Sequence, residues 1–279
     1  MTSQIPILAG GLGECCFTAV RHEGAPAGKV VTISGVPTYV SEPQTAKTVD
    51  KTKVVLFLAD VYGPLYINNQ LVQDYFASQG FIVVGVDYFL GDPVYIHTEP
   101  DFDRPAWLEK SKHQARELMP GWVNAIREKY GEDTQYSAVG YCFGAPFVLD
   151  LAACGDIVAG AIVHPAFLTK DHFKNIKRPV LLSCAGTYHL LLPNHIILQS
   201  LIETDRTFPL ESRRRAEDIL IEIKASYCFQ VFSGVKHGFA LRGNPMLAIL
   251  VSWAKEESAR GIANWIHRFC TEASQSVQL

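Results

Sequence analysis

Apolar runs of strand length alternate with helix-patterned segments along this chain, and this alternation constrains its fold more than any other feature. Runs of this kind lie at 53–59, 81–86, 136–139, 157–163, 179–184 and 226–232. Segments with helical spacing lie at 68–79, 107–130, 145–153, 212–223 and 247–269, the second of them broken or kinked at Pro120. A continuous apolar run predicts a strand covered on both faces, and strands alternating with helices indicate βαβ units. The sequence therefore predicts an α/β fold with a mostly parallel central sheet flanked by helices on both faces, and a further edge strand at 29–34.

The chain has 279 residues, which is within the range of one α/β domain. Hydrophobic residues make up 48% and charged residues 19%, a composition typical of a globular protein with a sizeable core. Neither a low-complexity linker nor a repeat of fixed period interrupts it. We therefore expect a single domain over residues 1–279.

Composition also excludes several classes of function. The net charge of −3 provides no basic field for nucleic acid or an anionic membrane, and the sequence has no apolar run of the ~20 residues that a membrane span needs. The cysteines number seven and form no CxxC pair, so neither a disulfide framework nor a zinc site is predicted. The first sixteen residues lack the pattern of a signal peptide. We expect a cytoplasmic protein with reduced thiols, no metal and no cofactor; its oligomeric state is left open.

The segment Gly140-Tyr141-Cys142-Phe143-Gly144 fits the pattern glycine–x–nucleophile–x–glycine, with cysteine as the nucleophile. Such a motif forms a sharp strand-to-helix turn, in which the flanking residues must be small. The turn places the thiol at a helix N-terminus, where the helix dipole favours the thiolate. A buried cysteine between chance glycines is the alternative, but the strand before and the helix after favour a nucleophile.

The other six cysteines lack such a setting, and we expect buried structural thiols there. For the adjacent Cys15 and Cys16, near the N-terminus, an exposed thiol pair is a second possibility.

Together, the motif at 140–144 and the stretch VKHGFALRGNP at 235–245 resemble the dienelactone hydrolase family of α/β-hydrolases. The chain is also similar to the fungal, carboxymethylenebutenolidase-like branch at 15–16 (CC), 22–24 (HEG), 60–63 (DVYG) and 87–92 (DYFLGD). The resemblance runs over most of the chain in order. It implies an α/β-hydrolase fold and a small ester or lactone as substrate.

A nucleophilic thiol needs a base, and in this fold the order along the chain is nucleophile, acid, histidine. His237 is the histidine in the right place and order. Read without a gap, the loop after strand 179–184 has Tyr188 where the acid should stand. The stretch 203–209 (ETDRTFP), however, is similar to what the family shows directly after this strand. That alignment makes Asp205 the acid and residues 186–202 an insertion.

The inserted stretch is apolar and resembles neither a solvated loop nor an amphipathic helix. A lineage-specific lid and a translated non-coding segment would both look like this, and the two origins stay open.

Further site residues follow from the fold and the resemblance. Backbone N–H groups of Val61 and Phe143 are expected to form the oxyanion hole. Asp60 matches an acidic position that influences the ionisation of the nucleophile in the relatives, although the family's better-studied members carry Glu there. Arg242 is a candidate to bind a substrate carboxylate by paired hydrogen bonds. Four aromatic residues are pocket or core candidates: Tyr62, Trp107, Tyr88 and Phe89.

Two functions are consistent with these residues. The first is a hydrolase that acts through Cys142, His237 and Asp205 and forms an acyl-enzyme. The second is a protein of this fold with little hydrolytic activity, either a biosynthetic isomerase or cyclase, or an enzyme inactivated by the insertion before the acid.

Overall fold

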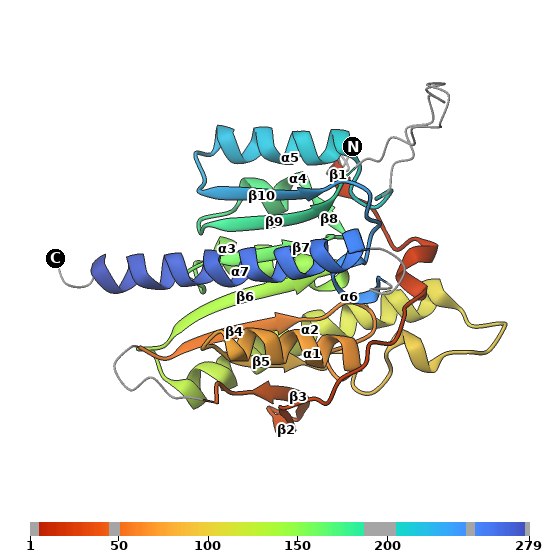
Figure 1. Ribbon diagram of the computed structural model, residues 1–279, viewed down its shortest axis with the longest axis horizontal. Coiled ribbons are helices and arrows are strands. Elements are labelled where there is room, and N and C mark those ends of the chain that lie inside the picture. Colours follow the sequence, from red (N-terminus) through yellow and green to blue (C-terminus); the bar gives the residue numbers. More distant parts are fainter. Residues whose placement is uncertain (1–5, 45–50, 187–204, 244–248, 277–279) are drawn as a thin grey trace.

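A computed structural model describes residues 6–44, 51–186, 205–243 and 249–276 of the chain. Its centre is an eight-stranded sheet with the order β10-β9-β7-β6-β4-β5-β3-β2 (Figure 1). Neighbouring strands are parallel from β10 to β5, and β3 and β2 continue the sheet as antiparallel strands. The strands are β2 (Lys29–Ile33), β3 (Val36–Ser41), β4 (Lys53–Leu58), β5 (Ile82–Val86), β6 (Gln135–Tyr141), β7 (Gly160–Val163), β9 (Val180–Ala185) and β10 (Tyr227–Phe232).

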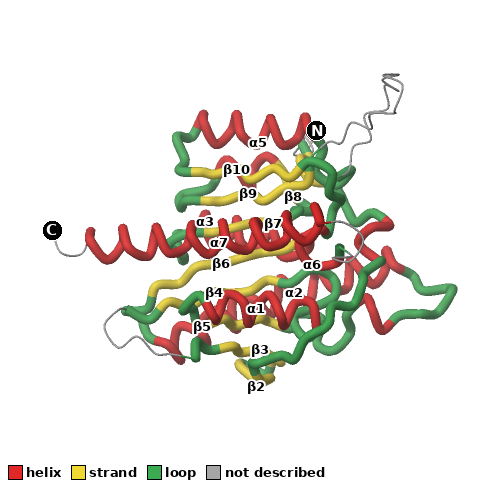
Figure 2. Tube along the Cα trace, in the orientation of Figure 1, coloured by secondary structure: helices red, strands yellow, loops and turns green. Residues whose placement is uncertain are grey.

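Helices cover both faces of this sheet (Figure 2). One face packs against α1 (Ile67–Ser78), α6 (Phe239–Arg242) and α7 (Ile249–Ser276). The other face packs against α2 (Arg104–Tyr130), α3 (Ala145–Cys154), α4 (Lys170–Lys174) and α5 (Leu210–Glu222). A small antiparallel pair, β1 (Ile7–Ala9) and β8 (Leu168–Thr169), lies beside the main sheet. The predicted α/β fold, with a mostly parallel sheet between two helical layers, is confirmed.

The apolar runs of the sequence follow directly from this layering. In β4, Val54 and Leu56 point into the core on one face of the sheet, and Val55 and Phe57 point into the core on the other. Successive side chains of a strand alternate between faces, so a strand buried on both faces must be apolar throughout. The edge strand β2 is less buried than the central strands, and its Val30 is exposed.

Two details of α2 differ from the prediction. The helix begins at Arg104 rather than at 107, because Asp103 caps it by accepting a hydrogen bond from the Ala106 amide (2.9 Å) and Pro105 occupies its first turn. Pro120 does not break the helix, which is continuous to Tyr130. Pro120 is exposed, so water can satisfy the carbonyl that loses its partner there.

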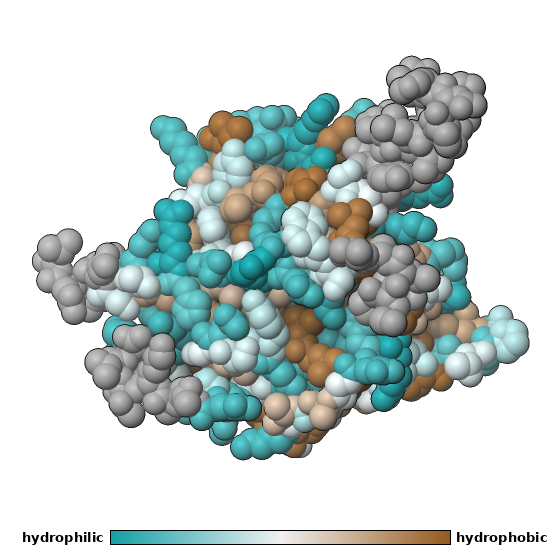
Figure 3. All heavy atoms as spheres, viewed as in Figure 1, coloured by the Kyte–Doolittle hydropathy of each residue, from teal (hydrophilic) through white to brown (hydrophobic). Residues whose placement is uncertain are grey.

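The surface of the molecule is mainly hydrophilic on the face shown in Figure 3, with hydrophobic residues scattered across it. Among the described residues, no helix combines the length and the apolar character needed to cross a membrane.

The predicted insertion lies almost entirely outside the described residues, which resume at Asp205. Its first residue, Gly186, donates a backbone hydrogen bond to Phe232 (2.7 Å) and so extends the pairing of β9 with β10 by one residue. Tyr188, the residue in the place of the acid when the sequence is read without a gap, also lies outside the described part.

Candidate active site

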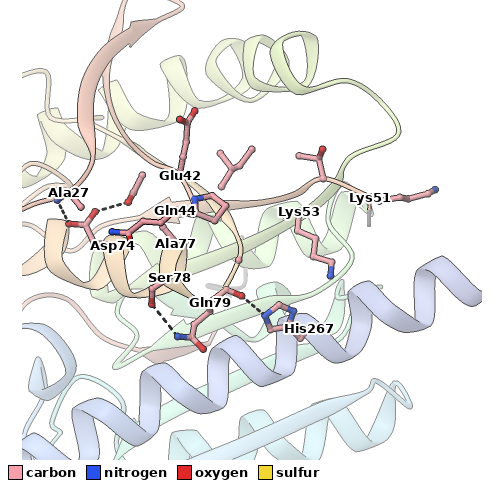
Figure 4. A pocket seen from close by; sticks show the side chains of 15 residues that line it. Ala27, Glu42, Gln44, Lys51, Lys53, Asp74, Ala77, Ser78, Gln79 and His267 are labelled. Atoms are coloured by element: carbon pink, nitrogen blue, oxygen red, sulfur yellow. Dashed lines mark hydrogen bonds between the residues drawn. The ribbon is translucent and has the colours of Figure 1, made fainter. Parts of the chain in front are cut away.

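The predicted site residues lie at the carboxyl ends of the parallel strands. Asp60 follows β4, Cys142 follows β6 and His237 follows β10. In α/β sheets of this kind the carboxyl edge is the usual place for ligand binding. A hollow of about 610 Å³ lies instead around the amino ends of β4 and β5 (Figure 4), and its lining includes Lys53, Asp74 and His267 but none of the predicted site residues.

The turn that carries Cys142 has the strained geometry expected of a nucleophile elbow. Cys142 has a φ of +49°, in a region that non-glycine residues rarely adopt. It begins a short 3₁₀ turn, Cys142–Gly144, from which α3 continues. A Cβ on Gly140 would lie 2.6 Å from the Gly144 carbonyl oxygen, and a Cβ on Gly144 would lie 2.1 Å from the Leu58 carbonyl oxygen. Both glycines are therefore required by close backbone packing.

The structure brings Cys142, His237 and Asp205 into one hydrogen-bonded line. Nε2 of His237 lies 3.2 Å from Sγ of Cys142, and Nδ1 lies 3.1 and 3.2 Å from the two carboxylate oxygens of Asp205. All three residues are buried, and Cys142 has no exposed surface. The arrangement places the imidazole ring of His237 beside the Cys142 sulfur and the Asp205 carboxylate on the other side of that ring.

The charge of His237 is set by these neighbours. Burial disfavours the imidazolium, but the charge and hydrogen bonds of Asp205, together with contributions from Cys16, outweigh burial and raise the pKa of His237 to about 10. With this raised pKa, His237 holds its proton at neutral pH.

Asp205 is held in place by its own turn. Its Oδ1 accepts hydrogen bonds from the backbone amides of Thr207 (3.0 Å) and Phe208 (3.1 Å). Such a turn fixes the carboxylate before α5 begins at Leu210.

Val61 and Phe143, the predicted oxyanion-hole residues, come from neighbouring strand ends. Leu58 of β4 pairs with Gly140 of β6, so the segments that follow these strands leave the sheet side by side. Both Val61 and Phe143 are buried.

Asp60 and Arg242 form a buried ion pair. Arg242 Nη1 contacts Asp60 Oδ2, while Oδ1 of Asp60 accepts from the Tyr62 amide and the Asn69 side chain, both at 3.1 Å. Burial opposes the charge of Arg242, but the charge of Asp60, with smaller effects from Cys142, Cys16 and Tyr62, outweighs it and raises the pKa of Arg242. Among the described residues, Nε and Nη2 of Arg242 are buried and have no hydrogen-bond partner.

The aromatic candidates divide between the site and the core. Tyr62 lies beside Arg242, whose guanidinium carbon is 5.7 Å from the centre of its ring. Trp107 is buried further away: it stacks on Phe89 with ring centres 5.6 Å apart, and its indole N–H donates to the Asp92 carbonyl (3.0 Å). Trp107 therefore packs with the aromatic core behind Phe143.

Cys16 lies at the candidate site, although it is not among the site residues predicted from the sequence. It lies in a 3₁₀ turn, Glu14–Phe17, it has no exposed surface, and its Sγ is 4.0 Å from that of Cys142. The possibility of an exposed thiol pair at Cys15 and Cys16 is thus wrong for Cys16. The sequence also predicts buried thiols at the remaining cysteines. This prediction is wrong for Cys154, which is exposed, and agrees with Cys184 and Cys270, which are buried.

His164, at the end of β7, is buried behind the site. Its ring centre lies 5.0 Å from that of His237, nearly perpendicular to it, and neither of its ring nitrogens has a hydrogen-bond partner among the described residues. Burial and the nearby charges of His237 and Arg242 lower the pKa of His164 well below its ordinary value.

Comparison with known proteins identifies the family. The dienelactone hydrolase family matches residues 36–270. This chain belongs to that family. It is 36% identical over 269 residues to dienlactone hydrolase 1 of Gibberella moniliformis, an alignment that covers 94% of this chain and 95% of the relative.

More distant relatives agree with this membership. The chain is 23% identical over 258 residues to a carboxymethylenebutenolidase homolog of Xenopus tropicalis, covering 91% of this chain and 96% of the relative. Among solved structures, a putative dienelactone hydrolase of Klebsiella pneumoniae superposes with a TM-score of 0.66 at 14% identity, over 88% of this chain and 99% of that one. The fold is thus that of the α/β-hydrolases, and the protein is a hydrolase of a small-molecule ester or lactone.

Proposed function

We propose that this protein hydrolyses a small lactone or ester through an acyl-enzyme on Cys142, with His237 as acid and base and Asp205 as its orienting carboxylate. The observation that carries the proposal is the continuous line from the Cys142 thiol through the His237 ring to the Asp205 carboxylate, with contacts of 3.1 to 3.2 Å. A buried nucleophile, base and orienting group in this order are the requirement for covalent acyl transfer.

In the first half of the reaction, Sγ of Cys142 attacks the carbonyl carbon of the substrate. The oxyanion that forms accepts hydrogen bonds from the backbone N–H groups of Val61 and Phe143. His237 gives the proton on Nε2 to the leaving alkoxide, and the C–O bond breaks to leave a thioester on Cys142.

In the second half, His237 takes a proton from a water molecule, and the resulting hydroxide attacks the thioester. The C–S bond breaks and the thiolate of Cys142 returns, again beside an imidazolium. Asp205 keeps Nδ1 of His237 as the donor throughout, so Nε2 is always the atom that faces the sulfur. No step requires a metal ion or an organic cofactor.

The proposed substrate carries a carboxylate close to the scissile bond. Arg242 is buried at the site, and its Nε and Nη2 have no partner among the described residues, although Nη1 is paired with Asp60. Two free guanidinium donors match the two oxygens of a carboxylate. Asp60, by holding Nη1, orients the guanidinium for this contact.

The test is steady-state hydrolysis of an unsaturated lactone and of an activated ester by wild-type protein and by Cys142→Ala. We expect hydrolysis to be lost with Cys142→Ala and unchanged with Cys154→Ala, which removes an exposed thiol on α3. Full turnover by Cys142→Ala would overturn the assignment. A wild-type protein whose Cys142 thiol is inert would favour the second function, a non-hydrolytic member of this fold.

A further inference from the structure

Three side chains from distant parts of the chain meet at one point of the site. Cys16 Sγ, Cys142 Sγ and His237 Nε2 lie within 4.8 Å of one another, and all three residues are buried. The sulfur atoms are 4.0 Å apart, and Nε2 is 3.2 Å from the sulfur of Cys142. The proposed hydrolysis uses two of these groups and has no role for the third, Cys16.

The separations match those of ligands around one tetrahedral metal ion. Bond lengths of about 2.3 Å from zinc to sulfur and about 2.0 Å to nitrogen give tetrahedral edges of about 3.5 to 3.8 Å between ligand atoms. Two of the separations, 3.2 and 4.0 Å, lie on either side of that range. The third pair, Cys16 Sγ and His237 Nε2, lies within 4.8 Å, so this separation must shorten by at most about 1.3 Å for all three atoms to bind one ion.

The surroundings also match a metal site. A histidine that binds zinc usually donates its other ring N–H to a carboxylate, and Nδ1 of His237 already faces Asp205 at 3.1 Å. Two thiolates neutralise a divalent cation, which makes the occupied site compatible with burial. Three protein ligands leave the fourth position open for water.

We propose that Cys16, Cys142 and His237 form a binding site for one Zn²⁺ ion, which switches hydrolysis off reversibly. As the ion binds, the protons carried by the two sulfur atoms and by Nε2 of His237 are released to solvent, so both cysteines bind as thiolates and His237 binds through Nε2 in its neutral form. The nucleophile and the base are then both occupied. The inhibitory part of this inference rests on the proposed function, whereas the binding part does not.

Sequence spacing could not have predicted this site. Sequence-readable zinc motifs place their ligands a few residues apart, in patterns such as CxxC. Here the ligands come from the 3₁₀ turn Glu14–Phe17, the elbow after β6 and the segment after β10. A site assembled in this way exists only in the folded protein, so Zn²⁺ is expected to stabilise the fold.

The experiment titrates the reduced protein, kept in a non-thiol reductant, with Co²⁺ as a spectroscopic probe and with Zn²⁺ as its competitor. We expect one ion per chain, with thiolate-to-cobalt charge transfer and the intense d–d bands of tetrahedral Co²⁺. Cys16→Ser should weaken Zn²⁺ binding on the order of 100-fold or more. Loss of a group that only hydrogen-bonds to a metal ligand already lowers metal affinity about 10- to 100-fold, and Cys16 is a ligand itself. Cys15→Ser is the matched control, because it changes the adjacent thiol and keeps all three ligands.

A measurement without variants guards against loss of folding. One equivalent of Zn²⁺ should protect both Cys16 and Cys142 of the wild-type protein from alkylation, as mapped by peptide mass spectrometry. Exposed Cys154 should be alkylated at the same rate with and without the ion. Protection of Cys142 alone would overturn the three-ligand site, as would equal affinity in Cys15→Ser and Cys16→Ser.

Activity assays then separate the two proposals. Zn²⁺ should inhibit lactone hydrolysis over the same concentration range in which it binds, and a chelator should restore the rate. Tight binding that depends on Cys16, in a protein without hydrolytic activity, would contradict the proposed function and leave the metal site standing. Active protein that Zn²⁺ neither binds nor inhibits would contradict the metal site alone.

Discussion

His237 is the residue on which the chemistry of the site converges. Its ring contacts Cys142 at Nε2 and Asp205 at Nδ1, and His164 packs against it nearly at right angles. Because the ring is buried, its protonation is decided by these neighbours and not by solvent. His164, whose pKa is lowered well below its ordinary value by burial and by the charges of His237 and Arg242, adds no competing charge on that side.

Substitution of Asp205 is therefore expected to change both the titration and the rate. In Asp205→Asn the carboxylate charge is lost while burial remains, so the pKa of His237 should fall from about 10. Hydrolysis should fall on the order of 10²- to 10⁴-fold. NMR titration of the His237 ring and steady-state kinetics would measure the two effects, with Asp218→Asn, an exposed carboxylate on α5, as the control. An unchanged titration in Asp205→Asn would contradict the account.

At the scale of single residues, the sequence predicts a role only for residues that stand in a recognisable local motif or in a known order along the chain. Cys142 stands in a glycine-flanked turn between strand and helix, and His237 follows the last strand, so both could be placed from pattern and order. Cys16 could not, because its approach to Cys142 depends on the path of the N-terminal segment across the sheet edge. The pairing of Arg242, the last residue of α6, with Asp60, which follows β4, joins two segments far apart in the chain and could not be read from the sequence either.

At the scale of elements, the turn between β6 and α3 determines where Cys142, the proposed nucleophile, lies. The sequence patterns of the strand and of the helix are ordinary ones. The turn between them requires glycine at positions 140 and 144, because a Cβ atom at either position would overlap backbone atoms of other residues. The positive φ of Cys142 is maintained by that packing.

Gly144→Ala tests this requirement. Its Cβ would overlap the Leu58 carbonyl, and since backbone cannot yield as a flexible side chain does, we expect the free energy of unfolding to fall by about 3 kcal/mol or more. In Gly121→Ala, within α2, the new Cβ would meet only Ser34 Oγ at 3.7 Å, and stability should rise by about 0.5 to 1 kcal/mol. Urea unfolding of both variants measures the contrast, and equal stabilities would refute the packing argument.

Element boundaries follow from the sequence where a capping signal exists. Asp103 and Pro105 explain the early start of α2, and these residue types could have been read as a helix start. The short α6 could not be predicted, because four residues after a turn carry no periodic pattern. Continuity of α2 through Pro120 depends on solvent exposure, which only the folded structure reveals.

At the scale of the whole molecule, the site is assembled from strand ends that are distant in sequence. The fold class follows from the alternation of strands and helices, and the structure places Asp60, Cys142 and His237 after the carboxyl ends of β4, β6 and β10. The place of Asp205 did not follow from strand order, since residues 187–204 stand between it and β9 and lie outside the described part. Its own turn and the contact with His237 determine it instead.

The raised pKa of His237 makes stability depend on pH. Its pKa is about 10 in the folded protein, above the ordinary histidine value of 6.5, so the folded state binds the proton more tightly than the unfolded state. The resulting contribution to the free energy of unfolding is fully present below about pH 6.5 and is lost as the pH rises towards 10. The stability difference between wild-type protein and His237→Gln, measured by urea unfolding, should therefore shrink from pH 6.5 to pH 10. A difference independent of pH would show that His237 is not charged in the folded state.

The central claim is that Cys142 carries the acyl group during turnover, and rapid-quench mass spectrometry tests it most directly. Mixed with an activated ester and quenched in acid, the protein should gain the mass of one acyl group. Peptide mapping should place that group on Cys142 and not on Cys16, although the two sulfur atoms are 4.0 Å apart. An acyl group on Cys16, or hydrolysis with no acyl group on Cys142 at any quench time, would contradict the account.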